Sequence, residues 1–163
     1  MNKVWNPNAQ MAGLRFSGLF ALTLSLYFAY IIALNALHIY APTSPLLDPG
    51  WFQHVPLLPI VLSLWIMWSY LRQLKKHNAG GWQAMLVIIR DEYALSVYRK
   101  AGAQAFLVVI HLCLVLFYLS ILQPDYPRLL GLVNTQASIA LLILSSGIVF
   151  GISIMRQLKE EDE

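Results

Sequence analysis

The stretch that decides the fold is residues 101–122, AGAQAFLVVIHLCLVLFYLSIL, which contains no Lys, Arg, Asp or Glu. A helix that crosses a hydrocarbon core about 30 Å thick needs about 20 apolar residues, and this run supplies them. A helix of this length on the surface of a soluble protein would carry a charged stripe. Because residues 101–122 carry none, they predict a membrane-spanning helix.

Three other runs of the chain have the same character. They cover about residues 14–37, 56–73 and 132–155. The whole chain is 58% hydrophobic and 12% charged, whereas soluble proteins average about 25% charged residues. The few charges cannot form the polar coat of a soluble domain. We therefore expect an all-α, integral membrane four-helix bundle that forms a single domain over residues 1–163.

The positions of Lys and Arg predict the orientation. Of the 11 Lys and Arg residues, only Arg128 lies in the loops that follow the first and third runs. The others lie before the first run or at its start (Arg15), at the end of the second run (Arg72), in the connector 74–100 or in the acidic tail 156–163. Loops rich in Lys and Arg stay in the cytoplasm. We therefore expect both termini in the cytoplasm, and a location in the bacterial cytoplasmic (inner) membrane.

The connector 74–100 contains apolar residues at helical spacing. They are Trp82, Met85, Ile89, Tyr93 and Val97. This spacing predicts either a cytoplasmic amphipathic helix at the membrane surface or a cytoplasmic extension of the third span.

The order of these features resembles the DUF2178-type family of small predicted membrane proteins. That family carries an Asp-Glu-Arg motif followed a short distance later by Lys-Ala. The matching residues here are Asp91-Glu92-Tyr93, Lys100-Ala101 and Ala105-Phe106, with Tyr93 where the family usually has arginine. Since the family has no established biochemical activity, the resemblance implies a four-span fold and little more.

His111 is the candidate cofactor-binding residue. It lies near the middle of the third run, where a polar side chain is costly and often functional. It could ligate haem, bind a quinone or relay protons, but we favour a hydrogen bond to a neighbouring helix. None of His38, His54 and His77 matches its depth, as a second haem ligand must. We expect no bound cofactor and no metal, and keep a haem- or quinone-binding redox protein as an alternative.

The connector also carries the candidate partner-binding set, which consists of Arg90, Asp91, Glu92, Arg99 and Lys100. These charges could simply belong to a membrane-surface helix that fixes orientation. Otherwise we expect them to dock a protein partner rather than to catalyse a reaction. No G-x-S-x-G, H-E-x-x-H or glycine-rich phosphate loop occurs. The leading hypothesis is a non-enzymatic accessory, regulatory or assembly subunit that binds no nucleic acid.

Gly147 and Gly151 are the candidate helix-packing residues. Lipid gives apolar helices no hydrophobic reason to associate, so small residues that allow close approach matter. Glycines four residues apart could seat two helices of one chain, or of two chains in a homo-oligomer.

A small transporter or channel is the other alternative. The runs contain no Asp or Glu, which argues against a proton-coupled multidrug carrier. The single cysteine, Cys113, excludes a thiol oxidase that works with paired cysteines. A polar path would have to form from Ser17, Ser25, Gln104, His111, Gln136 and Ser145.

The redox alternative predicts that detergent-purified protein shows visible absorption or carries extractable quinone. A colourless sample without quinone would rule it out, and an absorption spectrum with a lipid extract makes this measurement.

Overall fold

The computed structural model describes residues 7–47, 55, 57–76, 91–127 and 133–162, and every regular element in them is a helix. The long helices are α1 (Pro7–Tyr40), α3 (Leu57–Lys76), α5 (Glu92–Leu122) and α6 (Thr135–Asp162). A short 3-10 helix, η1 (Pro45–Leu47), follows α1. All 4 long helices are long and apolar enough to cross a membrane. The prediction of an all-α structure with four helices able to span a membrane is therefore confirmed.

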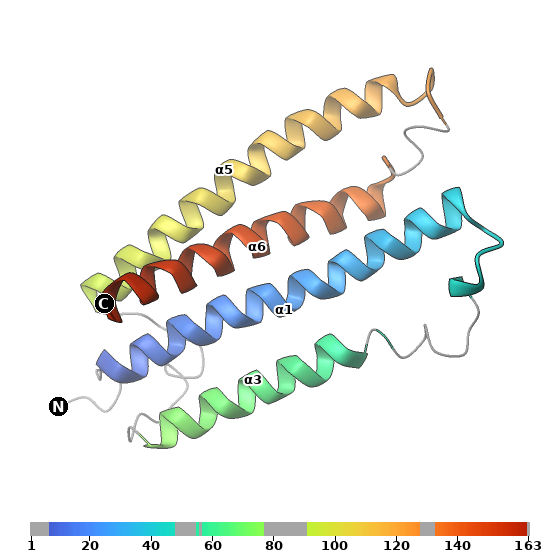
Figure 1. Cartoon of the computed structure of the whole chain (residues 1–163). Coiled ribbons are helices and arrows are strands. Elements are labelled where there is room, and N and C mark those ends of the chain that lie inside the picture. The colour runs from blue at the N-terminus through green and yellow to red at the C-terminus, as the bar shows by residue number, and fades with distance from the viewer. Residues whose placement is uncertain (1–6, 48–54, 56, 77–90, 128–132, 163) are drawn as a thin grey trace.

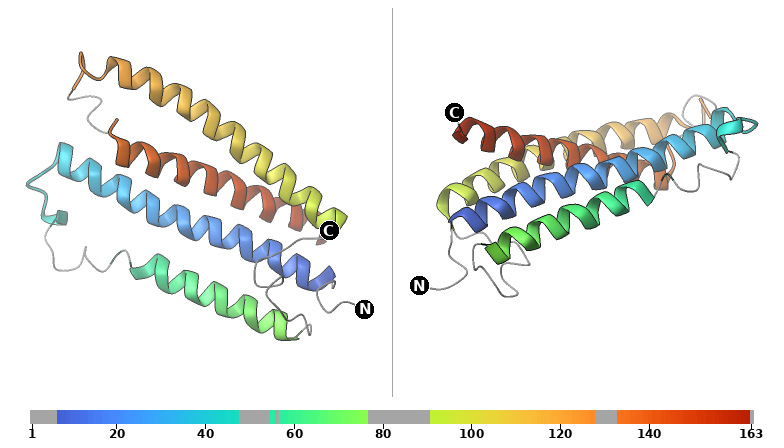
Figure 2. Two further views of the ribbon diagram at one scale, coloured as in Figure 1. Left: turned by 180° about the vertical axis from the view of Figure 1, so that it is seen from behind. Right: turned by 60° about the horizontal axis from the view of Figure 1, so that its bottom comes forward.

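The helices lie side by side in the order α3, α1, α6, α5 (Figure 1). α1 and α6 form the central pair and share the most extensive contact, while α3 packs on α1 and α5 packs on α6. Seen from behind, the order is the same, and both views in Figure 2 place the start of α1 and the end of α6 at one end. This arrangement puts the first turns of α1 and α5 beside the last turns of α3 and α6.

That shared end carries most of the charge, and we call it the charged end. Its basic residues are Arg15, Arg72, Lys75, Lys76, Arg99, Lys100, Arg156 and Lys159. The opposite end, near Tyr40, Leu57, Leu122 and Thr135, is called the far end.

α1 and α5 extend well beyond the apolar runs. They contain 34 and 31 residues, which corresponds to about 51 Å and about 46 Å at 1.5 Å per residue. α5 begins at Glu92 rather than near residue 101, because the Asp91 carboxylate accepts a hydrogen bond from the Ala94 amide at 2.9 Å and caps the helix. Residues 92–100 thus form a helical extension of the third span. Trp82, Met85 and Ile89 lie outside the described residues.

The bounds of α6 also differ from the apolar run. The helix begins at Thr135 rather than residue 132, because Asn134 Oδ1 accepts a hydrogen bond from the Ala137 amide at 2.8 Å. At its other end, α6 continues beyond Met155 to Asp162. The first turns of the expected tail are therefore helical.

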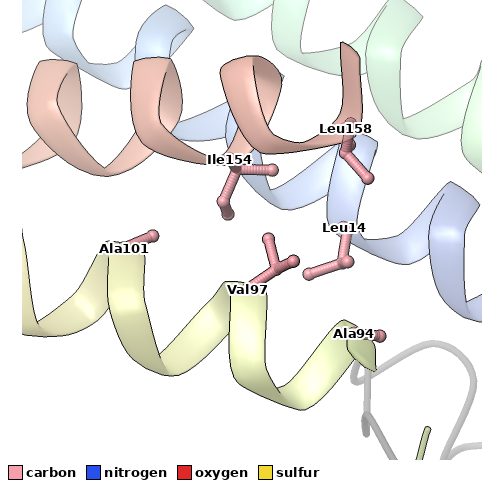
Figure 3. Packing of buried hydrophobic residues seen from close by; sticks show 6 residues of the cluster. All are labelled: Leu14, Ala94, Val97, Ala101, Ile154 and Leu158. Carbon is pink, nitrogen blue, oxygen red and sulfur yellow. The ribbon is translucent and has the colours of Figure 1, made fainter. Parts of the chain in front are cut away.

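The largest buried apolar cluster lies at the charged end, where α1, α5 and α6 meet. Its members are Leu14, Ala94, Val97, Ala101, Ile154 and Leu158. Figure 3 shows the Val97 side chain pointing between Leu14 and Ile154, and these three are at most 1% exposed. The cluster fixes α5 against both central helices.

A second cluster joins α1 to α3 at the same end. Ala9 and Ala12 pack against Tyr70 and Leu74. The Phe16 ring stacks on that of Tyr70 with 4.6 Å between the ring centroids. Both clusters are level with the charged residues, so all four helices are fixed at this end.

Glycines let α1 and α6 approach closely. A β-carbon on Gly151 would lie 2.8 Å from the carbonyl oxygen of Gly18. A β-carbon on Gly147 would meet Ser25 Oγ and lie 3.0 Å from the carbonyl oxygen of Ala21. The structure thus places both glycines against α1 of the same chain. We call these contacts the glycine seam.

Replacement of Gly151 by alanine should lower the thermal midpoint of the detergent-solubilised protein. Overpacking against backbone atoms that cannot rotate away costs about 1–3 kcal/mol. The matched control is Gly102→Ala in α5, because no atom other than those of its chain neighbours and of the nearby α5 backbone lies within 4 Å of a β-carbon placed there. That control should be neutral, or stabilising by up to about 1 kcal/mol, since alanine favours a helix. Equal midpoint shifts for the two variants would contradict the seam.

Candidate functional site

The extension 92–100 is tied to both central helices by polar contacts. The Asp91 amide donates to Oε1 of Gln10, a residue of α1 that is only 6% exposed, at 3.1 Å. The Tyr93 hydroxyl donates to the backbone carbonyl of Gln157 on α6 at 3.3 Å. These two hydrogen bonds and the buried Val97 side chain hold the extension in one position.

Aromatic packing supports the same segment. The rings of Tyr98 and Phe150 of α6 pack nearly perpendicular to each other, with 5.3 Å between the centroids. Tyr93 and Tyr98 each keep 41% of their surface exposed. The extension therefore has one face fixed to the protein and another face that carries tyrosine and charge.

Glu92, Arg99 and Lys100 are exposed. Within the described residues, no hydrogen bond or ion pair engages their side chains. Glu92, Ser96 and Arg99 lie at i, i+4 and i+7 and therefore share one face of α5. We call Glu92, Ser96 and Arg99 the outer stripe.

The predicted partner-binding set therefore separates into three parts. Asp91 is partly buried and its carboxylate caps α5. Glu92 and Arg99 belong to the outer stripe, whereas Lys100 lines a groove between α5 and α6. Arg90 lies outside the described residues. Of the members that the structure describes, Glu92, Arg99 and Lys100 present charge with no structural task, and Glu92 and Arg99 do so away from the groove.

His111 lies on an exposed face of α5, and its Nδ1 is 2.7 Å from the carbonyl oxygen of Leu107. Since a carbonyl only accepts, Nδ1 donates, and the bond stays within α5 instead of reaching a neighbouring helix as we expected. His38 likewise bonds to Leu34 of its own helix. Among the described residues, no group of three or more His, Cys, Asp and Glu side chains could hold a metal ion.

Several hydroxyl and amide groups of α1 and α6 are satisfied in the same local way. Thr23, Ser25 and Asn35 donate to carbonyls four residues earlier in α1, at 2.8–2.9 Å. Ser145 donates to Leu141 of α6 at 2.7 Å. Local satisfaction is how a polar side chain avoids an unpaired donor in lipid. Gln104, His111 and Gln136 are exposed rather than turned toward Ser25 and Ser145, so these residues do not converge on a path.

Sequence patterns did not reveal three features of the structure. They are the hydrogen bond from the Asp91 amide to Gln10, the contact of Gly18 with α6, and the position of Lys100 and Arg156 in the lining of one groove. The sequence does show one property that Lys100 and Arg156 have in common, which is that each lies directly beside an apolar run. Gln10 stands in a polar segment that shows no pattern.

In comparisons with known proteins, no family model, no curated protein and no solved structure matches the chain. The resemblance to the DUF2178-type family therefore stays a prediction.

Replacement of Asp91 by alanine should destabilise the protein by about 1 kcal/mol, because the first turn of α5 loses its cap. Asp91→Ser should restore most of the loss, since serine also caps. Glu92→Ala should change stability by less than about 0.5 kcal/mol, as exposed residues usually do. Thermal unfolding of the three variants checks this ranking. If the serine variant were as unstable as the alanine variant, the capping role would be wrong.

Proposed function

We propose that this protein is a non-enzymatic accessory, regulatory or assembly subunit that binds a cytoplasmic protein partner through the outer stripe. The observation that carries the proposal is the exposure of Glu92 and Arg99 on a segment whose opposite face is buried. A surface that is already fixed loses little conformational freedom when a partner binds. Its charges can select a partner of complementary charge and speed the encounter.

The exposed tyrosines support the same assignment. Tyr93 and Tyr98 lie beside the outer stripe and combine a large ring with a polar hydroxyl. Tyrosine and arginine are enriched in protein–protein interfaces, whereas lysine and glutamate are depleted. In this proposal Arg99 and the two tyrosines supply contact area, and Glu92 supplies specificity.

The proposed orientation places the charged end in the cytoplasm and therefore both termini there, in the inner membrane of a bacterium. It rests on the bias of Lys and Arg toward that end. The partner is then a cytoplasmic protein or the cytoplasmic part of another membrane protein.

Reversal of both stripe charges, Glu92→Lys with Arg99→Glu, should abolish co-purification of the partner and leave the thermal midpoint unchanged. The matched control is Lys76→Glu, which reverses an exposed charge at the same end on α3. Affinity purification from native membranes, with the partner identified and the interaction rebuilt from purified components, makes the comparison. The proposal fails if wild-type protein retains no partner, or if the control variant loses the partner as completely.

The orientation predicts which introduced cysteines are labelled from outside intact cells. In a Cys113→Ser background, Thr43→Cys and Asp125→Cys should react with a membrane-impermeant maleimide. Gln73→Cys and Glu160→Cys should react only after permeabilisation. All four positions are exposed in the structure. The opposite pattern would place the charged end outside the cytoplasm.

A further inference from the structure

The groove between α5 and α6 at the charged end combines cations with an apolar floor. It has a volume of about 670 Å³, within the range of about 300–1,000 Å³ that is usual for ligand sites. Lys100 and Gln104 line it from α5, and Ile148, Ile152, Arg156 and Glu160 line it from α6. We propose that this groove binds one anionic phospholipid, with the phosphate between Lys100 and Arg156 and an acyl chain along Ile152 and Ile148.

The depth of the two cations fits a lipid headgroup. Lys100 is the last charged residue of α5 before its apolar run, and Arg156 is the first charged residue of α6 after its own. Both therefore lie where the hydrocarbon meets the headgroup layer. Basic pockets between membrane helices at this depth are suited to anionic headgroups.

Hydrogen-bonding capacity remains for a phosphate. Arg156 Nε donates to Glu160 Oε1 at 3.1 Å. A guanidinium carries five N–H donors, so the four on its terminal nitrogens are left for phosphate oxygens. The ion pair also offsets the negative charge that Glu160 brings to the groove. Lys100 then leaves a net positive charge, which matches a headgroup with one phosphate.

The apolar part of the groove faces the bilayer. Ile152 and Ile148 lie one and two turns deeper than Arg156 on the same face of α6, and they are 54% and 37% exposed. Two other large crevices, between α1 and α3, have volumes of about 360 and 550 Å³ and no charged residue among their described lining residues. Those crevices suit hydrocarbon alone. A smaller crevice of about 190 Å³ between the same helices has one cation, Arg15, in its lining. The α5–α6 groove differs from these three because two cations, Lys100 and Arg156, line it.

The site is independent of the proposed partner surface. Neither Glu92 nor Arg99 lines the groove. A variant of the groove can therefore lose lipid binding and still bind the partner, and a variant of the outer stripe can lose the partner and still bind lipid.

The test measures lipid retention by native mass spectrometry, with the intact protein released from nanodiscs of phosphatidylglycerol or phosphatidylcholine. Wild-type protein should retain phosphatidylglycerol in preference to phosphatidylcholine. Lys100→Gln and Arg156→Gln should each weaken that retention about fivefold, the effect expected for one basic residue at an anionic membrane surface. Lys76→Gln, which removes an exposed cation at the same end but off the groove, should leave retention unchanged.

A steric pair tests the acyl-chain half of the groove without a change in charge. Ile152→Trp should block retention, whereas Ile139→Trp, at an exposed position of α6 off the groove, should not. Millimolar inorganic phosphate should fail to displace the lipid.

Four results would overturn the proposal. They are equal retention of the two lipids, an equal loss in Lys76→Gln, full retention in Ile152→Trp, and displacement by free phosphate. The last result would mean a site for a soluble anion.

Discussion

The close contact of α1 with α6 is the constraint on which the arrangement depends. In hydrocarbon, two apolar helices gain nothing from burying their side chains against each other instead of against lipid, so association must come from close packing. Gly18, Gly147 and Gly151 bring the backbones together, so near that a β-carbon on Gly147 or Gly151 would come within 3.0 Å of a backbone oxygen of α1. The other two helices attach to this pair, α3 to α1 and α5 to α6.

The charged end adds a second source of stability. The turns that hold Leu14, Val97 and Ile154 also hold Arg15, Arg99 and Arg156, so this core lies near water rather than in mid-membrane. There the hydrophobic effect operates, and complete burial of such a side chain contributes about 1.5–3 kcal/mol. Toward the far end α5 diverges from α6 (Figure 1), and Leu114, Phe117 and Tyr118 are more than 60% exposed. The molecule is held together at one end and exposes large apolar side chains toward the other.

Hydrophobic runs predicted the four helices well, because their length and lack of charge leave few alternatives. The ends of the helices were harder to predict. α5 and α6 begin where the side chains of Asp91 and Asn134 cap their first turns, and hydropathy does not detect such local hydrogen bonds. Helix order could not be derived, since all four runs are similarly apolar and any of them could have been central. The glycines of α6 indicated close packing against another helix, but the sequence did not show that this helix is α1.

The partner-binding set stays a prediction, and what the structure adds is which of its members have a structural role. A charged segment before the third run suggested a docking surface, and the sequence could not separate the structural Asp91 from the exposed Glu92 beside it. That separation depends on the Asp91 carboxylate, which accepts a hydrogen bond from the Ala94 amide and caps α5. The position of His111 in the middle of its run suggested a cofactor ligand or a hydrogen bond to another helix. In the structure its hydrogen bond goes to Leu107 of the same helix, α5.

The central claim is that residues 92–100 form a fixed, packed extension outside the hydrocarbon. Hydrogen exchange in lipid nanodiscs tests it most directly, because water reaches this segment and its amides exchange slowly only where they stay hydrogen-bonded in a stably held helix. A packed extension predicts strong protection of the amides of residues 96–100, and a marked loss of it in the Gln10→Ala variant. Exchange of these amides at the rate of an unstructured peptide would contradict the claim.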